Sequence, residues 1–366
     1  PGQALPRSGR RVTGGRSAAP RGIRWPGEWE RHAATWIAWP HNRSDWPARF
    51  GPIPWVYADI VRKIAPGERV RVLVNDAAHA ASARRHLDAV GVDPGQVDLR
   101  RIPTDRVWTR DSGPIVVRTG GARGGRAVAG FRFDAWSKYP DFRRDARIPA
   151  RAARLLDLPL LPVRRHGRDV VLEGGAIDGN GGGTVLVTEE CLLDPQVQVR
   201  NPGFGREDYE AVFADALGAR ATIWLGKGIA GDDTHGHVDD LARFVSPRTI
   251  VLAREDDPAD PNHATLAENR ERLRSARLAD GSRPEVVDLP MPRPVIFRGQ
   301  RLPASYANFY VANAAVLVPT FNDPADRVAL GILGELFRDR PVVGVHALDL
   351  VWGLGTLHCM TQQEPA

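Results

Sequence analysis

Cys359 is the residue of this chain best placed for nucleophilic chemistry. It is one of two cysteines among 366 residues, and it follows a turn with Gly353 and Gly355 and an apolar run at 341–350. A thiolate is a strong nucleophile when a nearby cation or hydrogen-bond donor stabilises it. We therefore predict that Cys359 is the catalytic nucleophile. The alternative, a buried and unreactive thiol, is our interpretation of Cys191.

A second chemically active group lies at 235–240. His237 and Asp239 are two residues apart and share one face of an extended segment, where an imidazole beside a carboxylate can act as general acid and base. His235, His237 and Asp239 also resemble part of the zinc signature of metallo-β-lactamase-fold hydrolases. The last position of that signature is Asp240 here instead of histidine. A zinc hydrolase is therefore an alternative interpretation.

Trp108, Asp111 and Glu173 precede other expected strands and add an aromatic face and two carboxylates. Three carboxylates that meet in one cavity are costly unless a cation lies between them. A guanidinium suits such a cavity because it is planar, always charged and able to stack on an aromatic ring. Taken singly, Asp111 and Glu173 are also interpretable as surface ion-pair partners of the many arginines.

The rest of the chain predicts an α/β protein in which short strands alternate with helices and Gly, Pro and Asp turns. Strands are expected at 69–74, 114–118, 170–172, 184–188, 221–225, 241–245, 249–253, 285–289, 308–311, 315–319 and 342–345, and helices at 53–64, 77–90, 146–156, 207–217, 264–279 and 324–337. The glycine-rich stretch at 178–183 is expected to be a hairpin turn. Polar clusters recur about every 50 to 70 residues, which indicates repeated units that bring five polar turns to one centre.

The net charge of +6 is no evidence for nucleic-acid binding. Residues 1–24 contain six arginines and no acid, whereas residues 25–366 hold 44 basic and 44 acidic side chains. We predict a disordered tail over 1–24 and one catalytic domain over 25–366. An RNA-binding protein that uses the tail is the non-enzymatic alternative. Two cysteines exclude a disulfide framework, and no stretch approaches the roughly 18 apolar residues of a membrane span, so we expect a cytoplasmic protein.

Taken together, these segments resemble the family of agmatine deiminases and bacterial peptidylarginine deiminases. The resemblance extends over nearly the whole chain after the tail, and its segments occur in the order of the family. They are Trp25-Pro-Gly-Glu-Trp29, His32-Ala-Ala-Thr-Trp36, Trp108-Thr-Arg-Asp111, Glu173-Gly-Gly175, Thr188-Glu-Glu-Cys-Leu-Leu193, Gly236-His237-Val-Asp239-Asp240, Ser305-Tyr-Ala-Asn308-Phe and His358-Cys359-Met-Thr-Gln-Gln363. This combination makes the zinc hydrolase a remote alternative.

The resemblance implies the five-bladed α/β-propeller, or pentein fold, of guanidine-modifying enzymes, with ββαβ-type repeats and pseudo-five-fold symmetry. It also implies that Cys359 attacks the guanidinium carbon, that ammonia leaves, and that water hydrolyses a covalent amidino-cysteine to a ureido product. His237 would protonate the leaving amine and then activate the water. No metal and no organic cofactor is implied.

The resemblance also implies which residues bind the substrate. Asp111 and Asp239 would hold the guanidinium nitrogens, and Glu173 would bind a nitrogen or orient His237. Trp108 would cover the guanidinium plane. Asn308 joins the residues expected to contact the substrate.

The identity of the substrate depends on its end far from the guanidine. Agmatine carries an amine there, so its site should offer a carboxylate, and Asp233 is the candidate. Free or peptidyl arginine would require a basic residue instead, which this arginine-rich sequence does not exclude. Two positions depart from the family: His235 replaces an acid, and 353–357 contains Leu354 and Thr356 where glycine is commoner. We expect an agmatine deiminase that acts on a small cationic substrate, with no nucleic-acid or membrane partner; a homo-oligomer is compatible with the sequence.

Overall fold

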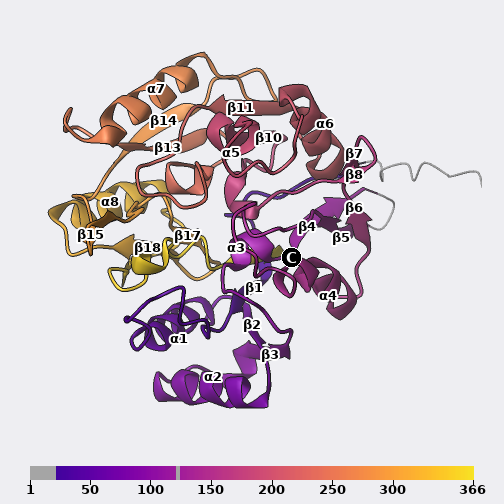
Figure 1. Ribbon diagram of the computed structural model, residues 1–366, viewed down its shortest axis with the longest axis vertical. Helices are drawn as coiled ribbons and strands as arrows, with labels where there is room; N and C mark the ends of the chain where they lie inside the picture. Colours follow the sequence, from indigo (N-terminus) through magenta and orange to yellow (C-terminus); the bar gives the residue numbers. More distant parts are fainter. Residues whose placement is uncertain (1–21, 121–123) are drawn as a thin grey trace, which may run out of the picture.

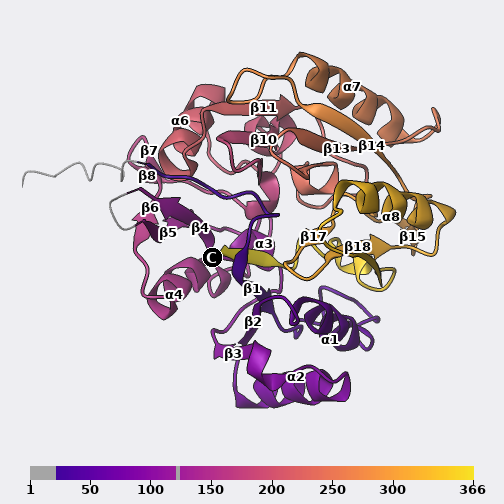
Figure 2. The same cartoon turned by 180° about the vertical axis from the view of Figure 1, so that it is seen from behind.

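The computed structural model describes residues 22–120 and 124–366 as an α/β protein made of several small sheets (Figure 1). In this part of the chain, five sheets have three or four strands and two have only two. The larger sheets lie in chain order around a central region that holds α3 (Thr109–Ser112), and most helices lie toward the outside (Figures 1 and 2). Residues 1–21 of the predicted tail lie outside the described residues.

The first sheet joins the two ends of the described chain. Its strand order is β20-β1-β2-β3, with β1 parallel to β2 and antiparallel to β20. The strands are β1 (His32–Ala38), β2 (Arg69–Val74), β3 (Val97–Arg101) and β20 (Gln362–Pro365), and the crossover helices are α1 (Ile53–Ile64) and α2 (Ala77–Ala89). This pairing fixes the segment that directly follows Cys359.

The other four larger sheets share one pattern, in which an antiparallel pair is followed by a helical crossover and a parallel third strand. They comprise β4 (Ile115–Thr119), β5 (Gly125–Gly130), α4 (Ile148–Leu155) and β6 (Leu160–Pro162); β9 (Asp178–Gly179), β10 (Thr184–Thr188), α5 (Glu189–Leu193), α6 (Arg206–Leu217) and β11 (Ala221–Leu225); β12 (Ala242–Phe244), β13 (Thr249–Arg254), α7 (Pro261–Ser275) and β14 (Glu285–Pro290); and β17 (Tyr310–Val311), β18 (Val316–Thr320), α8 (Pro324–Leu336) and β19 (Val342–His346). A parallel neighbour requires such a crossover, so each sheet is a ββαβ unit.

The remaining elements are short. Two hairpins consist of β7 (Arg164–Arg165) with β8 (Arg168–Asp169) and of β15 (Ile296–Phe297) with β16 (Gln300–Arg301). The 3-10 turns are η1 (Pro94–Gln96), η2 (Asp145–Arg147), η3 (Gly174–Ala176), η4 (Val238–Asp240) and η5 (Val351–Gly353). Three of the short segments, α3, η3 and η4, contact one another and carry polar residues into the interior.

The six predicted helices are confirmed, with ends that differ by a few residues, and the hairpin at 178–183 is confirmed by the pairing of β9 with β10. The predicted strand at 170–172 is wrong, because Val171 forms only an isolated bridge with Arg132. Among the strands of the larger sheets, the sequence analysis missed β1, β3, β5, β6 and β20. The predicted tail also ends too late, since Arg24 bridges to Arg118 and pairs with Glu30.

The largest hydrophobic core packs α1 and α8 against the first and last sheets and includes Trp36, Trp46, Tyr57 and Trp108. These aromatic side chains surround the turn that holds Cys359, so close packing fixes the position of the predicted nucleophile. Among the described residues, no helix is both long enough and apolar enough to cross a membrane.

Candidate active site

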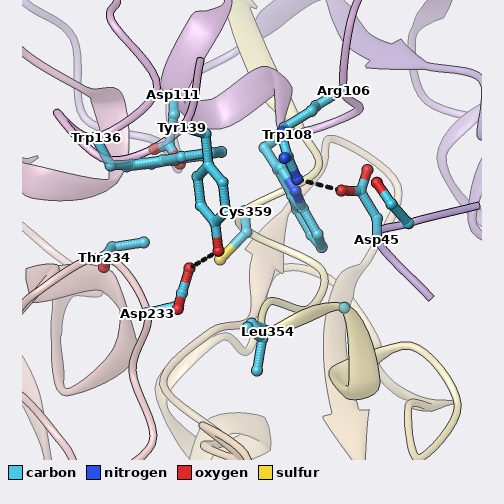
Figure 3. A pocket seen from close by; sticks show the side chains of 12 residues that line it. Asp45, Arg106, Trp108, Asp111, Trp136, Tyr139, Asp233, Thr234, Leu354 and Cys359 are labelled. Atoms are coloured by element: carbon cyan, nitrogen blue, oxygen red, sulfur yellow. Dashed lines mark hydrogen bonds and ion pairs between the residues drawn. The ribbon is translucent and has the colours of Figure 1, made fainter. Parts of the chain in front are cut away.

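A cavity of about 210 Å³ has Cys359 in its wall (Figure 3). The predicted residues Trp108, Asp111 and Asp233 also line it. The remaining lining residues are Ser44, Asp45, Arg106, Trp136, Tyr139, Thr234, Gly353 and Leu354. The thiol side is buried, with Cys359 and Asp111 each 6% exposed, whereas Ser44 is exposed and Asp233 is partly exposed. The cavity therefore has a buried inner end at Cys359 and a mouth near Asp233.

Asn308, which precedes β17, holds the turn of the nucleophile. Its Oδ1 accepts hydrogen bonds from Thr356 Oγ1 at 2.7 Å and from the His358 backbone N–H at 3.1 Å. Its Nδ2 lies 3.1 Å from Cys359 Sγ. A donor at this distance favours the thiolate form of a cysteine. Asn308 thus contacts the nucleophile, a role different from the substrate contact that the sequence predicted.

The glycines before Cys359 are required by close packing. A Cβ on Gly355 would lie 2.8 Å from the Trp108 ring and 3.1 Å from Cys359 Cβ, and one on Gly353 would lie 2.6 Å from the Trp46 indole nitrogen. Between them, Leu354 adopts a left-handed conformation with φ of 69°, which is unfavourable for a residue with a side chain. The departure from glycine at 354 is therefore accommodated at some conformational cost.

His237 enters the site at the start of η4 and is 1% exposed. Its Nδ1 lies 3.7 Å from Asp111 Oδ1 and 3.9 Å from Asp239 Oδ1. Its Nε2 lies 3.6 Å from Glu173 Oε2. Burial opposes protonation of His237, but the carboxylates prevail and raise its pKa well above the usual value. His237 is therefore an imidazolium that can give up a proton from Nδ1.

Gly175, in η3, allows His237 and Asp111 to approach each other. A Cβ at this position would lie 2.5 Å from His237 Nδ1 and 2.8 Å from Asp111 Oδ1. The Gly175 backbone N–H instead donates to Asp111 Oδ1 at 3.0 Å, and Trp136 Nε1 donates to the other oxygen at 3.0 Å. The Glu-Gly-Gly motif thus has a structural reason, and Trp136 is a site residue that the sequence analysis missed.

The three predicted carboxylates are buried but differ in their electrostatics. Burial and the charges of Asp239 and Glu173 raise the pKa of Asp111 to about 6. Burial also opposes ionisation of Glu173, but the guanidinium of Arg200, 3.3 Å away, outweighs it and lowers the pKa of Glu173 to about 2. Arg200 therefore neutralises the charge of Glu173, whose carboxylate also lies 3.6 Å from His237 Nε2.

The electrostatic environment of Cys359 disfavours the thiolate form of its side chain. Burial, together with the charges of Asp239, Asp240 and Asp111, raises the pKa of the Cys359 thiol well above its usual value. Burial and Asp239 likewise raise the pKa of Asp240, which keeps it protonated. Burial and the surrounding carboxylates therefore favour the neutral thiol form of Cys359.

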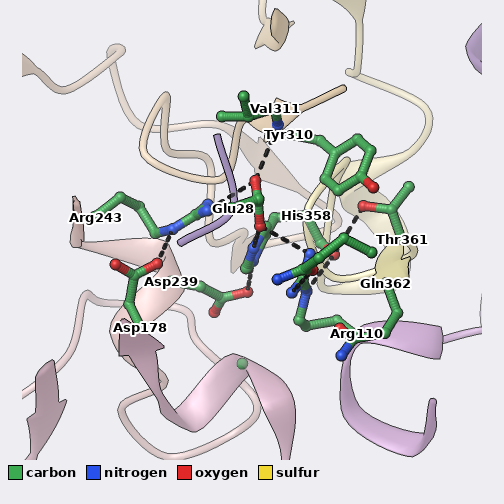
Figure 4. A network of polar contacts seen from close by, with 12 residues as sticks. Glu28, Arg110, Asp178, Asp239, Arg243, Tyr310, Val311, His358, Thr361 and Gln362 are labelled. Atoms are coloured by element: carbon green, nitrogen blue, oxygen red, sulfur yellow. Dashed lines mark hydrogen bonds and ion pairs between the residues drawn. The ribbon is translucent and has the colours of Figure 1, made fainter. Parts of the chain in front are cut away.

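A network of charged side chains includes His358, the residue that precedes Cys359 in the sequence (Figure 4). His358 Nδ1 lies 2.7 Å from Asp239 Oδ2, and its Nε2 lies 2.8 Å from Glu28 Oε2. Arg110 and Arg243 each approach Glu28 within 3.0 Å, and Arg243 also pairs with Asp178. Residues 357–360 form a turn, and His358 in this turn contacts Asp239.

Charges at the mouth of the cavity are already paired. Asp233 lies 2.6 Å from Lys138 Nζ and accepts a hydrogen bond from Tyr139 Oη at 2.7 Å (Figure 3). Arg106 pairs with Asp45, whose Oδ2 has no partner among the described residues. Asp233 is thus at the cavity as predicted, but it is not a free carboxylate.

The predicted zinc triad is not assembled in the described chain. His235 turns away from His237 and pairs with Asp194 at 2.9 Å. Two groups with donor atoms within 4.8 Å do occur, Glu173 with Cys191 and His237, and Asp239 with Asp240 and Cys359. The positive charge of Arg200 beside the first group and the amide donor of Asn308 inside the second oppose a bound metal ion. Cys191 is buried as predicted, yet it belongs to the surroundings of His237.

Comparison with known proteins confirms the resemblance. The pattern of the Porphyromonas-type peptidyl-arginine deiminases matches residues 24–365. A protein of Latilactobacillus sakei, provisionally named an agmatine deiminase, is 35% identical over 370 residues that cover 94% of this chain and 96% of that protein.

Solved structures agree with the sequence comparison. Agmatine deiminase of Enterococcus faecalis has a TM-score of 0.85 at 28% identity, over 94% of this chain and 96% of that one. A cysteine-to-serine variant of C. jejuni agmatine deiminase with substrate bound has a TM-score of 0.82 at 26% identity, with the same coverage of both chains. The α/β fold is therefore shared. The chain belongs to the Porphyromonas-type peptidyl-arginine deiminase family.

Proposed function

We propose that the protein is an agmatine deiminase, which hydrolyses agmatine to N-carbamoylputrescine and ammonia through a covalent amidino-cysteine. The observation that carries the proposal is a buried group of side chains at the inner end of the cavity. Cys359 and Asp111 line the cavity, His237 Nδ1 lies 3.7 Å from Asp111, and Asp239 lies 3.8 Å from the Cys359 sulfur. Relatives that align over 94% of the chain carry the agmatine deiminase name.

Substrate binding is the step that creates the nucleophile. A guanidinium between Asp111 and Asp239 offers N–H donors to carboxylates that are otherwise only partly satisfied, and Trp108 covers its plane. Its positive charge offsets the field that raises the pKa of Cys359. The thiol proton is released, and the thiolate forms only when the substrate is present.

The chemistry then proceeds in two halves. Cys359 Sγ attacks the guanidinium carbon, and His237 donates its proton to the departing nitrogen, so that the C–N bond breaks and ammonia leaves. Water next attacks the amidino carbon while the neutral His237 accepts its proton. The C–S bond breaks and the hydroxyl proton of the intermediate returns to the sulfur, which restores the neutral thiol and releases the ureido product. The proton that the thiol released on substrate binding leaves with ammonia as ammonium. Glu173 keeps His237 oriented throughout, since its Oε2 lies 3.6 Å from Nε2.

The choice of agmatine over arginine depends on the mouth of the cavity. Asp45 and Asp233 place two carboxylates there, and each of the nearby cations, Arg106 and Lys138, is already paired with one of them. An ammonium is better accommodated by this wall than a carboxylate, which would compete with Asp45 and Asp233 for their cations. Deimination of free or peptidyl arginine is the second candidate, favoured by the description of the family that matches.

The test is ammonia release by the purified protein, with EDTA present, from agmatine, free arginine and a peptide ending in arginine. We expect release from agmatine. Release only from an arginine compound would move the function to the second candidate, whereas activity lost to EDTA and restored by zinc would contradict the cysteine mechanism. Deletion of residues 1–21, which keeps Arg24 and its contacts, should leave kcat nearly unchanged, in contrast to the expectation for an RNA-binding tail.

We also propose that the five larger sheets are the blades of a five-bladed propeller within one catalytic domain over 25–366. The support is the ββαβ pattern that recurs in four sheets and the arrangement of all five around a central region (Figure 2). In the first sheet, β20 supplies the antiparallel strand from the other end of the chain.

A further inference from the structure

We propose that Glu28 and His358 are positioning residues: His358, protonated on both ring nitrogens, holds Asp239 ionised and oriented for the substrate, and Glu28 holds His358. The inference rests on the proposed guanidine chemistry, since Asp239 is the residue through which both act. It concerns two residues to which the mechanism above gives no role.

The contacts of His358 identify its protonation state. Nδ1 lies 2.7 Å from Asp239 Oδ2 and Nε2 lies 2.8 Å from Glu28 Oε2 (Figure 4). An ionised carboxylate only accepts hydrogen bonds, and an imidazole donates from both nitrogens only when both carry a proton. The side chain of His358 is 2% exposed, so water does not replace either partner. The geometry is that of an imidazolium between two carboxylates.

Glu28 is itself held in place as a carboxylate. Its Oε1 accepts from the Val311 backbone N–H at 2.9 Å and lies 3.0 Å from Arg243, while its Oε2 lies 3.0 Å from Arg110. Burial acts to raise the pKa of Glu28, but Arg243, His358 and Arg110 lower it well below the usual value. These donors hold the Glu28 carboxylate in one orientation. Because Glu28 Oε2 contacts His358 Nε2, the orientation of the His358 ring is fixed as well.

The two carboxylate oxygens of Asp239 therefore have different roles. Oδ2 is occupied by His358, whereas Oδ1 is buried and has no hydrogen-bond partner among the described residues. Oδ1 is therefore the atom left for a guanidinium N–H. Burial acts to raise the pKa of Asp239, but His358 outweighs it and lowers this pKa. Loss of His358 would leave a buried carboxylate that takes up a proton and ceases to bind a cation.

The charged neighbours of Asp239 and His358 also affect the pH dependence of activity. Around Asp239 they are Asp111, His237, Asp240, Arg243 and Cys359, and around His358 they are Glu28 and Arg110. Among them, Asp111, with its pKa of about 6, already sets an acid limb in the wild type. In a variant where Asp239 takes up a proton more easily, activity is lost at a higher pH than in the wild type.

The kinetic test compares two substitutions that each keep one half of the ring. The amide nitrogen of His358→Gln takes the place of Nε2 and keeps Glu28, whereas that of His358→Asn takes the place of Nδ1 and keeps Asp239. We expect H358Q to lower kcat/KM by about 10- to 150-fold, the range for a hydrogen bond to a charged group, and to move the acid limb upward by about 1 to 3 pH units. H358N should lose less activity. Glu28→Gln provides a second route, with a smaller shift in the same direction.

His32→Gln is the matched control. His32 is also buried, with Nδ1 2.9 Å from Glu68 and Nε2 2.7 Å from the Glu28 carbonyl oxygen. Glutamine keeps the second contact and loses the first, so H32Q should lower Tm and leave the acid limb in place. An acid limb that stays unmoved in H358Q, or that moves equally in H32Q, would overturn the proposal.

A spectroscopic measurement tests the protonation state without any substrate. In protein labelled with ¹⁵N-histidine, the signals of His358, assigned by their loss in H358N, should show both ring nitrogens protonated at pH 7. A single protonated nitrogen would overturn the proposal even if agmatine is the substrate. If the wild type acts on arginine instead, the proposed function changes while the same kinetic comparison is made with arginine.

Discussion

The two ends of the cavity handle charge in opposite ways. At the inner end, Asp111 and Asp239 are buried close to Cys359 and His237, and Asp239 Oδ1 has no hydrogen-bond partner among the described residues. At the mouth, Asp233 and its partner Lys138 are partly exposed and offset each other. Electrostatic attraction is strong where water is excluded and weak where solvent screens it. In the proposed function, the inner end therefore binds the guanidinium of the substrate, and the mouth distinguishes between guanidine substrates.

The largest effect is expected at the inner end from Cys359→Ala. Covalent catalysis has no substitute nucleophile in this cavity, so kcat should fall by at least about 10⁴-fold with the fold intact. Ammonia release and far-UV circular dichroism check the two parts of this prediction. A variant with more than roughly a tenth of wild-type activity would remove Cys359 from the mechanism.

Asp111→Asn should be the next most harmful change. It keeps the shape and one of the two hydrogen bonds that Asp111 accepts from Gly175 and Trp136, but it removes a charge from the guanidinium site, so kcat/KM should fall by about 10- to 150-fold. Asp134→Asn is the matched control, because Asp134 is partly buried nearby but contacts Ser137 and does not line the cavity. Equal kcat/KM for D111N and the wild type would mean that Asp111 does not hold the substrate.

The pH dependence of kcat/KM in the wild type reports on the inner end of the cavity. Asp111 must be ionised to bind a cation, and its pKa of about 6 lies above the usual value. Activity is thus present above this pKa and is lost as the pH falls through about 6, which kcat/KM of the free enzyme reports. In D111N this acid limb should disappear from the residual activity. A midpoint near 4 in the wild type would show that Asp111 is not held by the buried site in this way.

The smallest effect is expected at the mouth. Asp233→Asn should raise KM for agmatine by up to about 5-fold, as for an exposed charge pair, and leave kcat unchanged. The matched change Asp141→Asn, on an exposed acid that pairs with Arg106, should leave KM unchanged. A fall in kcat for D233N would contradict the separation of the two ends.

Much of the site could be predicted because its residues lie in short motifs of unusual composition. Cys359, His237, Asp111, Asp239 and Glu173 were each predicted, and the structure brings all five together. Motifs carry this information because each supplies the side chain and the glycine that lets it approach, as Gly175 does for His237.

The residues that were missed act through contacts between distant segments. Glu28 and His358 are 330 residues apart, and nothing in the periodicity near either one indicates the other. Arg200 gave no signal among so many arginines, although it determines the charge of Glu173. The strand β20 was missed because its polar side chains are buried by tertiary contacts, which local β-propensity does not report.

The pairing of β20 with β1 has a consequence for folding. Trp36 Nε1 donates to Glu364 Oε2 at 3.0 Å across 328 residues of sequence, and β20 begins three residues after Cys359. Contacts of such long range form late, because the entropy of closing the loop is lost before the contact stabilises the chain. We therefore expect the turn that holds Cys359 to form completely only when the whole chain has folded. In a denaturant titration, activity and the fluorescence of the buried tryptophans should disappear in the same transition.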